Sequence, residues 1–200
     1  MKKYLILSMI IAIGLNGCKK SKEELEKEEE VQKLKLVIEN VNSVYQLGSN
    51  GLAFFVDLEN AKTLRGACFN FRPKEGKASV KFYKHPEVYN LEVKAKNELE
   101  YILTYQGKQA TLKLILEGDY PVKEGSMQKL FANPILTVPG DDKANGSIGK
   151  MDLVYGGNSI RNLHHGRFNT LEECEAQNVK DDELNESLRK QESTCEGPGC

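Results

Sequence analysis

The segment 89–116 reads YNLEVKAKNELEYILTYQGKQATLKLIL and carries the clearest structural signal in the chain. Its apolar residues alternate with polar ones in three consecutive runs, which are Tyr89–Ala95, Leu99–Tyr105 and Leu112–Leu116. A period of two places one set of side chains against a core and the other set in water. The polar connections between the runs are short enough for hairpins. The segment therefore predicts three antiparallel strands that form a β-meander.

Other short apolar runs lie between turn-forming Gly, Pro and Asn residues and are further candidate strands. They are Lys33–Glu39, Leu52–Leu58, Leu64–Phe71, Ser79–Lys84, Pro134–Val138 and Lys150–Tyr155. Around the first of these, a helical stripe that includes Val31, Ile38 and Tyr45 overlaps a strand-like alternation, and we favour the strand.

The C-terminal part of the chain has helix signals instead. Thr170-Leu171-Glu172-Glu173 matches a capping box, so a helix should begin at Asn169 or Thr170, with Cys174 in its first turns. A second helical piece is expected over Asp182–Gln191. Roughly eight short strands followed by this helix predict a mainly β, α+β fold, built as an antiparallel β-sandwich or a small barrel.

The N-terminal residues have the pattern of a secretory signal, since Lys2 and Lys3 precede an uncharged apolar run, Tyr4–Leu15. About a dozen residues are too few for a membrane-spanning helix, which needs roughly 20. Directly after the run, Leu15-Asn16-Gly17-Cys18 resembles the lipobox of bacterial lipoproteins. The resemblance implies that a signal peptide at 1–17 is removed and that Cys18 then carries diacylglycerol and an amide-linked fatty acid such as palmitate. Such acyl chains would anchor the protein to a membrane.

The segment Lys19–Glu30 consists almost entirely of Lys and Glu, and Ser21 followed by Glu24 is a capping-box pattern. We expect a short charged helix from about Lys22 that acts as a spacer. The expected layout is a signal peptide at 1–17, a lipidated tether at 18–32, an antiparallel β domain at 33–168, and a C-terminal helix with a cysteine-containing tail at 169–200. The resemblance also implies the outer membrane of a Gram-negative cell, because Lys19 is not the Asp that retains lipoproteins in the inner membrane.

Besides the cysteine of the lipobox, the sequence has four cysteines, which are Cys68, Cys174, Cys195 and Cys200. An even number in an oxidising compartment favours two disulfides, and four cysteines allow three pairings. We favour Cys68 with Cys174, which would fasten the C-terminal helix to the sheet, and Cys195 with Cys200. The last two are not spaced as a redox Cys-X-X-Cys motif.

The segment Asp141–Asp152 partly resembles the calcium loop of EF-hands, with Asp141, Asn145 and Asp152 at ligand positions. Lys143 occupies another ligand position, where its ammonium would repel a cation. Asn145-Gly146 also suits a type I′ turn between two strands, and we favour that interpretation. Two adjacent histidines elsewhere would point to opposite faces of an extended segment and so would not form a zinc site. We therefore expect no metal and no other cofactor.

A hydrolase would have to use His164 or His165 with Ser159, or Cys68 with His85. The sequence has no Gly-X-Ser-X-Gly motif and no evident third residue to orient a base, so we expect no catalytic residue. A net charge of −1 without clustered basic residues argues against nucleic acid. We favour a non-enzymatic lipoprotein that contacts the membrane through its lipid and binds an envelope or host protein, in adhesion, assembly or inhibition. A periplasmic hydrolase that uses His and Cys residues is the alternative.

Overall fold

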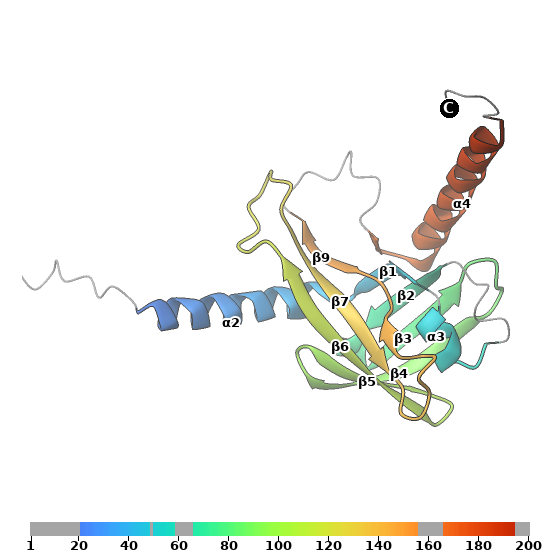
Figure 1. The fold of residues 1–200 in the computed structure, drawn as a ribbon. Helices are drawn as coiled ribbons and strands as arrows, with labels where there is room; N and C mark the ends of the chain where they lie inside the picture. The colour runs from blue at the N-terminus through green and yellow to red at the C-terminus, as the bar shows by residue number, and fades with distance from the viewer. Residues whose placement is uncertain (1–20, 49, 59–65, 156–165, 195–200) are drawn as a thin grey trace, which may run out of the picture. The chain divides into compact units, whose positions relative to one another are not determined.

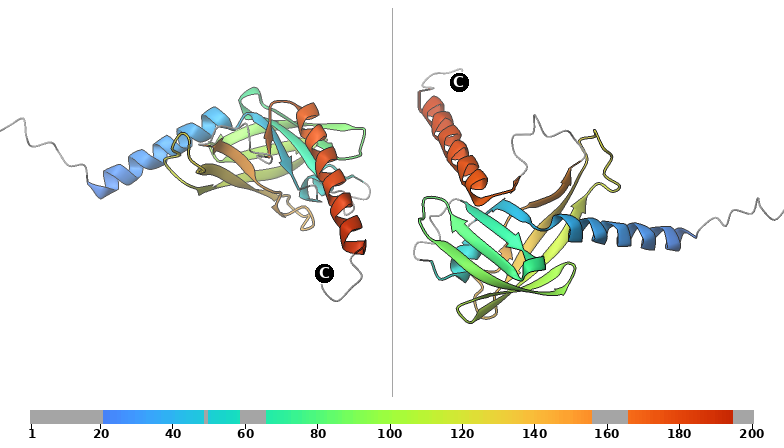
Figure 2. Two further views of the ribbon diagram at one scale, coloured as in Figure 1. Left: turned by 90° about the horizontal axis from the view of Figure 1, so that it is seen from above. Right: turned by 180° about the vertical axis from the view of Figure 1, so that it is seen from behind.

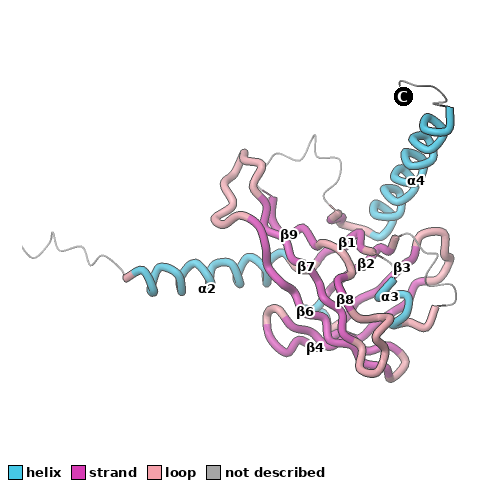
Figure 3. Tube along the Cα trace, viewed as in Figure 1, coloured by secondary structure: helices cyan, strands magenta, loops and turns pink. Residues whose placement is uncertain are grey.

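The computed structural model describes residues 21–48, 50–58, 66–155 and 166–194. The chain divides into two compact units, Met1–Lys35 and Leu36–Cys200, and each is described by itself. Strands dominate the second unit (Figures 1 and 3). Among the described residues, none of the helices combines the length and the hydrophobicity that a bilayer crossing requires.

Helix α2, Lys22–Asn40, begins at the capping box that the sequence predicted. The backbone N–H of Glu24 donates to Ser21 Oγ over 3.2 Å, and the N–H of Ser21 donates to Glu24 Oε2 over 2.8 Å. In the first unit, exposed ion pairs four residues apart join turns of the helix, as between Lys27 and Glu23 at 2.7 Å. Such pairs support a helix that has few apolar side chains.

The predicted strand at Lys33–Glu39 is wrong, since α2 continues to Asn40. The helix prevails because Val37 and Val41, which are four residues apart in the second unit, are both buried. The N–H of Val41 also donates to the carbonyl of Val37 over 2.8 Å, so the helical hydrogen bonds extend past the last helical residue.

The second unit contains an antiparallel sheet. Its strands are β1 (Ser43–Leu47), β2 (Ala67–Arg72), β3 (Lys77–Phe82), β4 (Val88–Asn97), β5 (Glu100–Tyr105), β6 (Lys108–Gly118), β7 (Lys129–Thr137), β8 (Gly146–Ser147), β9 (Met151–Tyr155) and β10 (Arg167–Phe168). The described strands form one ten-stranded sheet in the order β10-β1-β2-β3-β4-β5-β6-β7-β8, and β9 pairs with β7.

The predicted meander is confirmed as β4, β5 and β6. The candidates at Ser79–Lys84, Pro134–Val138 and Lys150–Tyr155 correspond to β3, β7 and β9 with shifted bounds, and β2 lies in the described part of the candidate at Leu64–Phe71.

The sheet curls until its two ends meet, as Figure 1 shows. Strands β1 and β9 come into contact, and the N–H of Gly48 donates to the carbonyl of Ile148 over 2.8 Å. The predicted mainly β fold with a C-terminal helix is therefore confirmed. Of the two architectures that the sequence left open, the chain adopts the small barrel.

Inward-facing side chains fill this barrel. The largest fully buried ones are Tyr45, Leu52, Phe55, Phe69, Phe71, Phe82, Leu103, Leu112, Leu114, Leu130, Leu136 and Met151. The ring of Phe71 packs against those of Phe69 and Tyr101, with centroid distances of 5.2 and 5.0 Å. The described strands thus enclose a packed core, as in barrels whose interior is just wide enough for side chains.

The predicted strand at Leu52–Leu58 is wrong, because a short helix, α3 (Asn50–Phe55), occupies this position. Leu52, Phe55 and Val56 are each at most 4% exposed and belong to the barrel core. A continuous apolar run is compatible with a buried strand and with a buried helix alike. Here the run is apolar because α3 packs into the barrel core.

Arg167 on β10 makes hydrogen bonds across the seam, which is the place where the two ends of the sheet meet. Its Nε donates to Ser43 Oγ in β1 over 3.1 Å, and its guanidinium also donates to the carbonyl of Leu153 in β9. A further contact of 3.5 Å reaches Asn40 Oδ1 at the end of α2. The planar fork of one guanidinium therefore joins both ends of the sheet and the helix that enters it.

Replacing Arg167 with lysine should lower the free energy of unfolding by about 1–2 kcal/mol, because one ammonium cannot reach all three acceptors. Urea denaturation followed by circular dichroism measures this change. Arg189→Lys, on an exposed turn of the C-terminal helix, is the matched control and should change the free energy by less than about 0.5 kcal/mol. Equal losses in the two variants would contradict the role of Arg167 in the seam.

Helix α4, Leu171–Thr194, begins where the sequence predicted, and Thr170 Oγ1 accepts the N–H of Glu173 over 3.2 Å. Its first half covers the outer face of β1 and β2, where Gln46 Nε2 donates to Asn178 Oδ1 over 2.8 Å and to Asp181 Oδ2 over 2.7 Å. The same face also has an apolar part, since Val44, Cys68 and Cys174 are buried there beside Phe168 and Leu171.

The second half of α4 has a different environment. The helical piece predicted at Asp182–Gln191 belongs to the same helix, and the side chains of residues 183–190 are all exposed. Figure 2 shows this end of α4 extending beyond the strands. The helix is therefore fixed to the barrel through its N-terminal half.

Candidate functional site

Two of the four cysteines predicted to form disulfides lie among the described residues. Cys68 and Cys174 are bonded to each other, as we favoured, with Cα atoms 5.9 Å apart and both side chains fully buried. Because the sulfur of Cys68 is in a disulfide, the hydrolase pair of Cys68 with His85 is wrong. The remaining predicted residues, which lie outside the described residues, are Cys18, Ser159, His164, His165, Cys195 and Cys200.

His85 lies between β3 and β4, where its ring packs beside Tyr89 with centroids 5.8 Å apart. Its Nδ1 accepts the N–H of Glu87 over 3.4 Å, and Tyr89 donates its hydroxyl to the Glu87 carboxylate over 3.1 Å. Burial and, to a smaller extent, the hydrogen bond to Glu87 together raise the pKa of Tyr89 to about 12. Tyr89 therefore stays a neutral donor in this turn.

The structure does not bring together the ligand positions of the segment that resembles a calcium loop. Asn145 Oδ1 accepts the N–H of Val138 over 2.6 Å, so this oxygen is used by the backbone. Asp152 is only 9% exposed on β9, whereas Asp141 lies in the loop that precedes β8. Within the described ranges, no group of three or more His, Cys, Asp or Glu side chains could hold a metal ion.

The type I′ turn predicted at Asn145-Gly146 is also wrong. Such a turn needs positive φ at both central residues, and of these two residues only Gly146 has one, at 131°. β7 and β8 are instead joined by the longer loop 138–145. The loop is folded on itself, since the carbonyl of Asp141 accepts the N–H of Ala144 over 3.1 Å.

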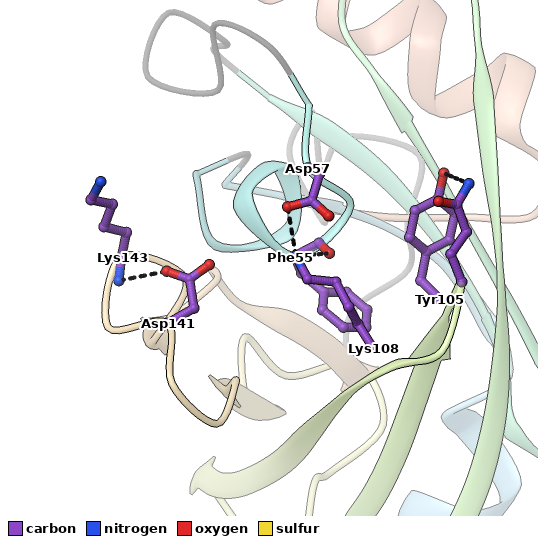
Figure 4. A network of polar contacts seen from close by, with 7 residues as sticks. Phe55, Asp57, Tyr105, Lys108, Asp141 and Lys143 are labelled. Carbon is purple, nitrogen blue, oxygen red and sulfur yellow. Dashed lines mark hydrogen bonds and ion pairs between the residues drawn. The ribbon is translucent and has the colours of Figure 1, made fainter.

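An open hollow of about 510 Å³, which we call the rim hollow, lies between the end of α3 and the loop 138–145 (Figure 4). Phe54 and Leu58 supply its apolar lining. Carboxylates and an ammonium group supply its polar lining, and they belong to Asp57, Asp141, Asp142 and Lys143. The hollow thus offers charges of both signs next to an aromatic ring.

The shape of the rim hollow on one side follows from how α3 ends. The N–H of Leu58 donates to the carbonyl of Ala53 over 2.9 Å, and the N–H of Asp57 donates to that of Phe54 over 3.2 Å. These are the two hydrogen bonds of a Schellman motif, in which the residue after the helix is left-handed. Asp57 takes that position with φ 55°. Aspartate is one of the few residues with a side chain that visit this region.

Lys108, at the start of β6, holds the end of α3 in place. Its ammonium donates to Asp57 Oδ1 over 2.6 Å and to the carbonyl of Phe55 over 3.5 Å, as Figure 4 shows. A cation at a helix C-terminus is favourable because the last carbonyls carry partial negative charge. The ion pair therefore orients one of the three carboxylates of the hollow.

Gly51 sets the distance between α3 and the loop 138–145. A Cβ added at Gly51 would lie 2.8 Å from Ile148 Cγ2 and 2.9 Å from the carbonyl oxygen of Ala144. Gly51→Ala should therefore displace the loop and lower the free energy of unfolding in urea by about 1–3 kcal/mol. Gly48→Ala is the control, because its nearest atom, the Ile148 carbonyl oxygen, would be 3.4 Å away. If both variants lost the same free energy, the close approach at Gly51 would not be the cause.

A second hollow, which we call the apolar groove, has a volume of about 320 Å³. Ile38 and Val41 at the end of α2, Pro73 in the 3₁₀ turn η2 (Pro73–Glu75), and Ala95 and Tyr101 on β4 and β5 line it. The connection between β4 and β5 forms one wall. Because consecutive hairpins of an antiparallel meander lie at opposite ends, the groove and Lys108 are at opposite ends of the barrel.

Tyr101 is a fixed part of the groove wall. Its hydroxyl donates to the carbonyl of Glu98 over 2.7 Å, and its ring meets that of Phe71 edge-on. Burial and, to a smaller extent, the nearby Glu98 carboxylate together raise the pKa of Tyr101 to about 12. The phenol is therefore neutral at any ordinary pH and keeps its hydrogen bond.

Sequence reasoning missed the rim hollow. Asp57 and Lys108 are 51 positions apart, so no local spacing connects them. The sequence does contain a signal for α3, which forms one side of the rim hollow. Leu52, Phe55 and Val56 have the i, i+3, i+4 spacing of one helix face. Six residues were too few for this spacing to outweigh the aromatic, strand-like composition.

A family model described as "Lipoprotein, tandem type" matches residues 1–200. Neither a curated protein nor a solved structure matches the chain. The family match extends from the lipobox-like start through the barrel to the C-terminal helix, so it applies to the chain as a whole.

Proposed function

Because the chain belongs to the family of tandem-type lipoproteins, we propose that it is a lipid-anchored envelope protein whose barrel binds another macromolecule without converting it. In this proposal residues 1–17 are a signal peptide, Cys18 carries the lipid, and residues 18–32 are a tether. The β domain at 33–168 and the helix and tail at 169–200 are the exposed part. Lys19, following the lipidated cysteine, supports the outer membrane as the location.

The proposal that the protein binds its partner on the outer surface rests on one observation, which is that side chains fill the interior of the barrel. Phe69, Phe71 and Leu103 are fully buried inside it, so the described strands have side chains where a ligand-carrying barrel has a chamber. A partner would therefore meet the outer surface and the loops at the ends. Surface loops on a rigid scaffold are the usual place for binding residues.

The rim hollow is the proposed contact site. Asp141, Asp142 and Lys143 stand on a loop whose backbone is fixed by internal hydrogen bonds, and Phe54 lies beside them. Charges of both signs next to an aromatic ring suit the mixed side chains of a polypeptide surface. An envelope or host protein is therefore the proposed partner.

Crosslinking in cells of the native host tests the contact site. The full-length protein and a variant with Asp141→Asn, Asp142→Asn and Lys143→Gln are purified after crosslinking, and the captured proteins are identified by mass spectrometry. We expect the wild type to capture a specific partner and the variant to lose it. A matched control with Glu92→Gln and Lys94→Gln, on exposed positions of β4, should retain it. Equal capture by all three proteins, or capture of nothing above background, would refute the proposed site.

Mass spectrometry of the mature protein tests the anchor separately. We expect an N-terminus at Cys18 with added fatty acyl mass, and an unprocessed chain when Cys18 is replaced by serine. A mature form that begins elsewhere would remove the anchor. Protease treatment of intact cells then reports the location, since cleavage at the cell surface favours host contact and protection favours a periplasmic partner.

A further inference from the structure

The rim of the apolar groove carries two opposite charges. Lys74, in the 3₁₀ turn η2, and Glu98, in the β4–β5 connection, both line the groove and are both exposed. In the part of the chain that the structure describes, neither side chain is held in an ion pair. The neighbouring Lys96, in contrast, is paired with Glu100 at 2.5 Å. One ammonium and one carboxylate are thus available beside an apolar floor.

We propose that the apolar groove binds one alkyl chain of a zwitterionic phospholipid, with the headgroup phosphate at Lys74 and the headgroup amine at Glu98. This site goes beyond the macromolecular binding proposed above and uses the opposite end of the barrel. It would bind a single lipid molecule and would not require the lipid on Cys18.

The floor of the groove suits an alkyl chain. Ile38 is 41% exposed although its side chain is aliphatic, and Ala95 is also exposed on β4. Val41 and Tyr101, at 2% and 4% exposed, form the fixed base. Covering the exposed apolar atoms with an alkyl chain removes them from water, which is favourable in proportion to the area covered.

The size of the groove favours one lipid chain over a larger partner. A volume of about 320 Å³ is at the lower end of the range for small-molecule sites, which is roughly 300–1,000 Å³. Such sites combine a mainly apolar lining with a few placed polar groups. The rim meets this description, because a headgroup that carries one negative and one positive charge can pair with both Lys74 and Glu98. A lipoprotein is also held where phospholipids are abundant.

The test measures the binding of lysophosphatidylethanolamine, below its critical micelle concentration, to the full-length chain with Cys18→Ser. This substitution leaves the probe as the only alkyl chain present. In isothermal titration calorimetry, a series of probes with longer chains should bind up to about fourfold more tightly for each added CH₂. The affinity should then become constant once the groove is filled. Simple partitioning into aggregates would keep rising with chain length.

Three variants test the location of the probe. Ala95→Phe should abolish binding by filling the groove from an exposed position, while near-UV circular dichroism stays unchanged. Lys74→Gln and Glu98→Gln should each weaken binding by up to about fivefold, which is the size of an exposed ion pair. The control, Asp142→Asn with Lys143→Gln at the rim hollow, should bind as the parent chain does.

A probe with the same chain and only a phosphate headgroup tests the amine contact. It should bind the parent chain more weakly than the zwitterionic probe, and Glu98→Gln should not weaken its binding. Equal affinity for the two probes, affinity that never levels off, or full binding by Ala95→Phe would each overturn the proposal. Binding of an apolar peptide with no binding of the lipid probe would overturn it too. None of these results would affect the lipid on Cys18 or the rim hollow.

Discussion

Replacing both Cys68 and Cys174 with alanine should lower the free energy of unfolding by about 4 kcal/mol, within the usual range of about 2–5 kcal/mol. The disulfide joins positions 106 residues apart, and in the chain-entropy model a long closed loop restricts the unfolded state more than a short one. Without it, the first half of α4 is held to the outer face of the barrel by the packing of Leu171 against the cluster that contains Val44, and by polar contacts such as the Lys81–Glu175 ion pair at 2.6 Å. Urea denaturation of the oxidised proteins measures the loss.

Limited proteolysis distinguishes this loss from a general weakening of the barrel. In the double variant, α4 should be cleaved faster than the strands, because its anchor is gone while the core is intact. Leu188→Ala, on the exposed second half of α4, is the control and should change stability by less than about 0.5 kcal/mol. A double variant within about 1 kcal/mol of the parent chain would show that the remaining contacts suffice.

Phe71→Ala should lower the free energy of unfolding by about 3–5 kcal/mol, which is the range for removing a buried aromatic ring. Phe71 is fully buried and touches the rings of Phe69 and Tyr101, so its neighbours cannot collapse into the space without losing their own contacts. Thermal and urea denaturation both report the change. The same measurement tests whether the barrel interior is filled.

The cavity left by Phe71→Ala gives a second readout. An apolar cavity of this kind stays dry and binds small apolar molecules such as benzene. Benzene should therefore raise the melting temperature of the variant and leave that of the parent chain unchanged. Ile115→Ala, at a side chain 43% exposed on β6, is the control and should cost about 1 kcal/mol or less. A loss of similar size in Phe71→Ala would mean that the core is loosely packed.

The elements that the sequence predicts well are those whose signals are local. The meander β4–β6 follows from a period of two over a few residues, and the helix starts at Ser21 and Thr170 follow from capping residues three positions apart. The pairing of Cys68 with Cys174 could be favoured because only a few combinations exist. Each of these inferences needs little knowledge of the tertiary structure.

The predictions that were wrong failed because tertiary contacts outweigh the local sequence signals. Residues 33–39 and 52–58 contain enough Val, Ile and Phe to read as strands, yet helices occupy 33–39 and 52–55. Val37, Leu52 and Phe55 pack into a barrel core that the local sequence does not reveal. The loop 138–145 was misread for the same reason, since the Asn145 side chain bonds the backbone of Val138 seven residues earlier. Both hollows combine segments distant in sequence, so neither could be located from spacing alone.

The strands that flank the barrel closure have a consequence if the proposed lipid anchor holds many copies in one membrane. β8 and β10 are each only two residues long, and β9, which also pairs with β7, is in contact with β1 where the barrel closes. Long unpaired edges invite lateral strand addition and aggregation, and very short ones discourage it. Lipoproteins are concentrated in a plane, where neighbouring copies meet far more often than in solution. Because its edge strands are short, the domain would remain monomeric even where many copies lie close together.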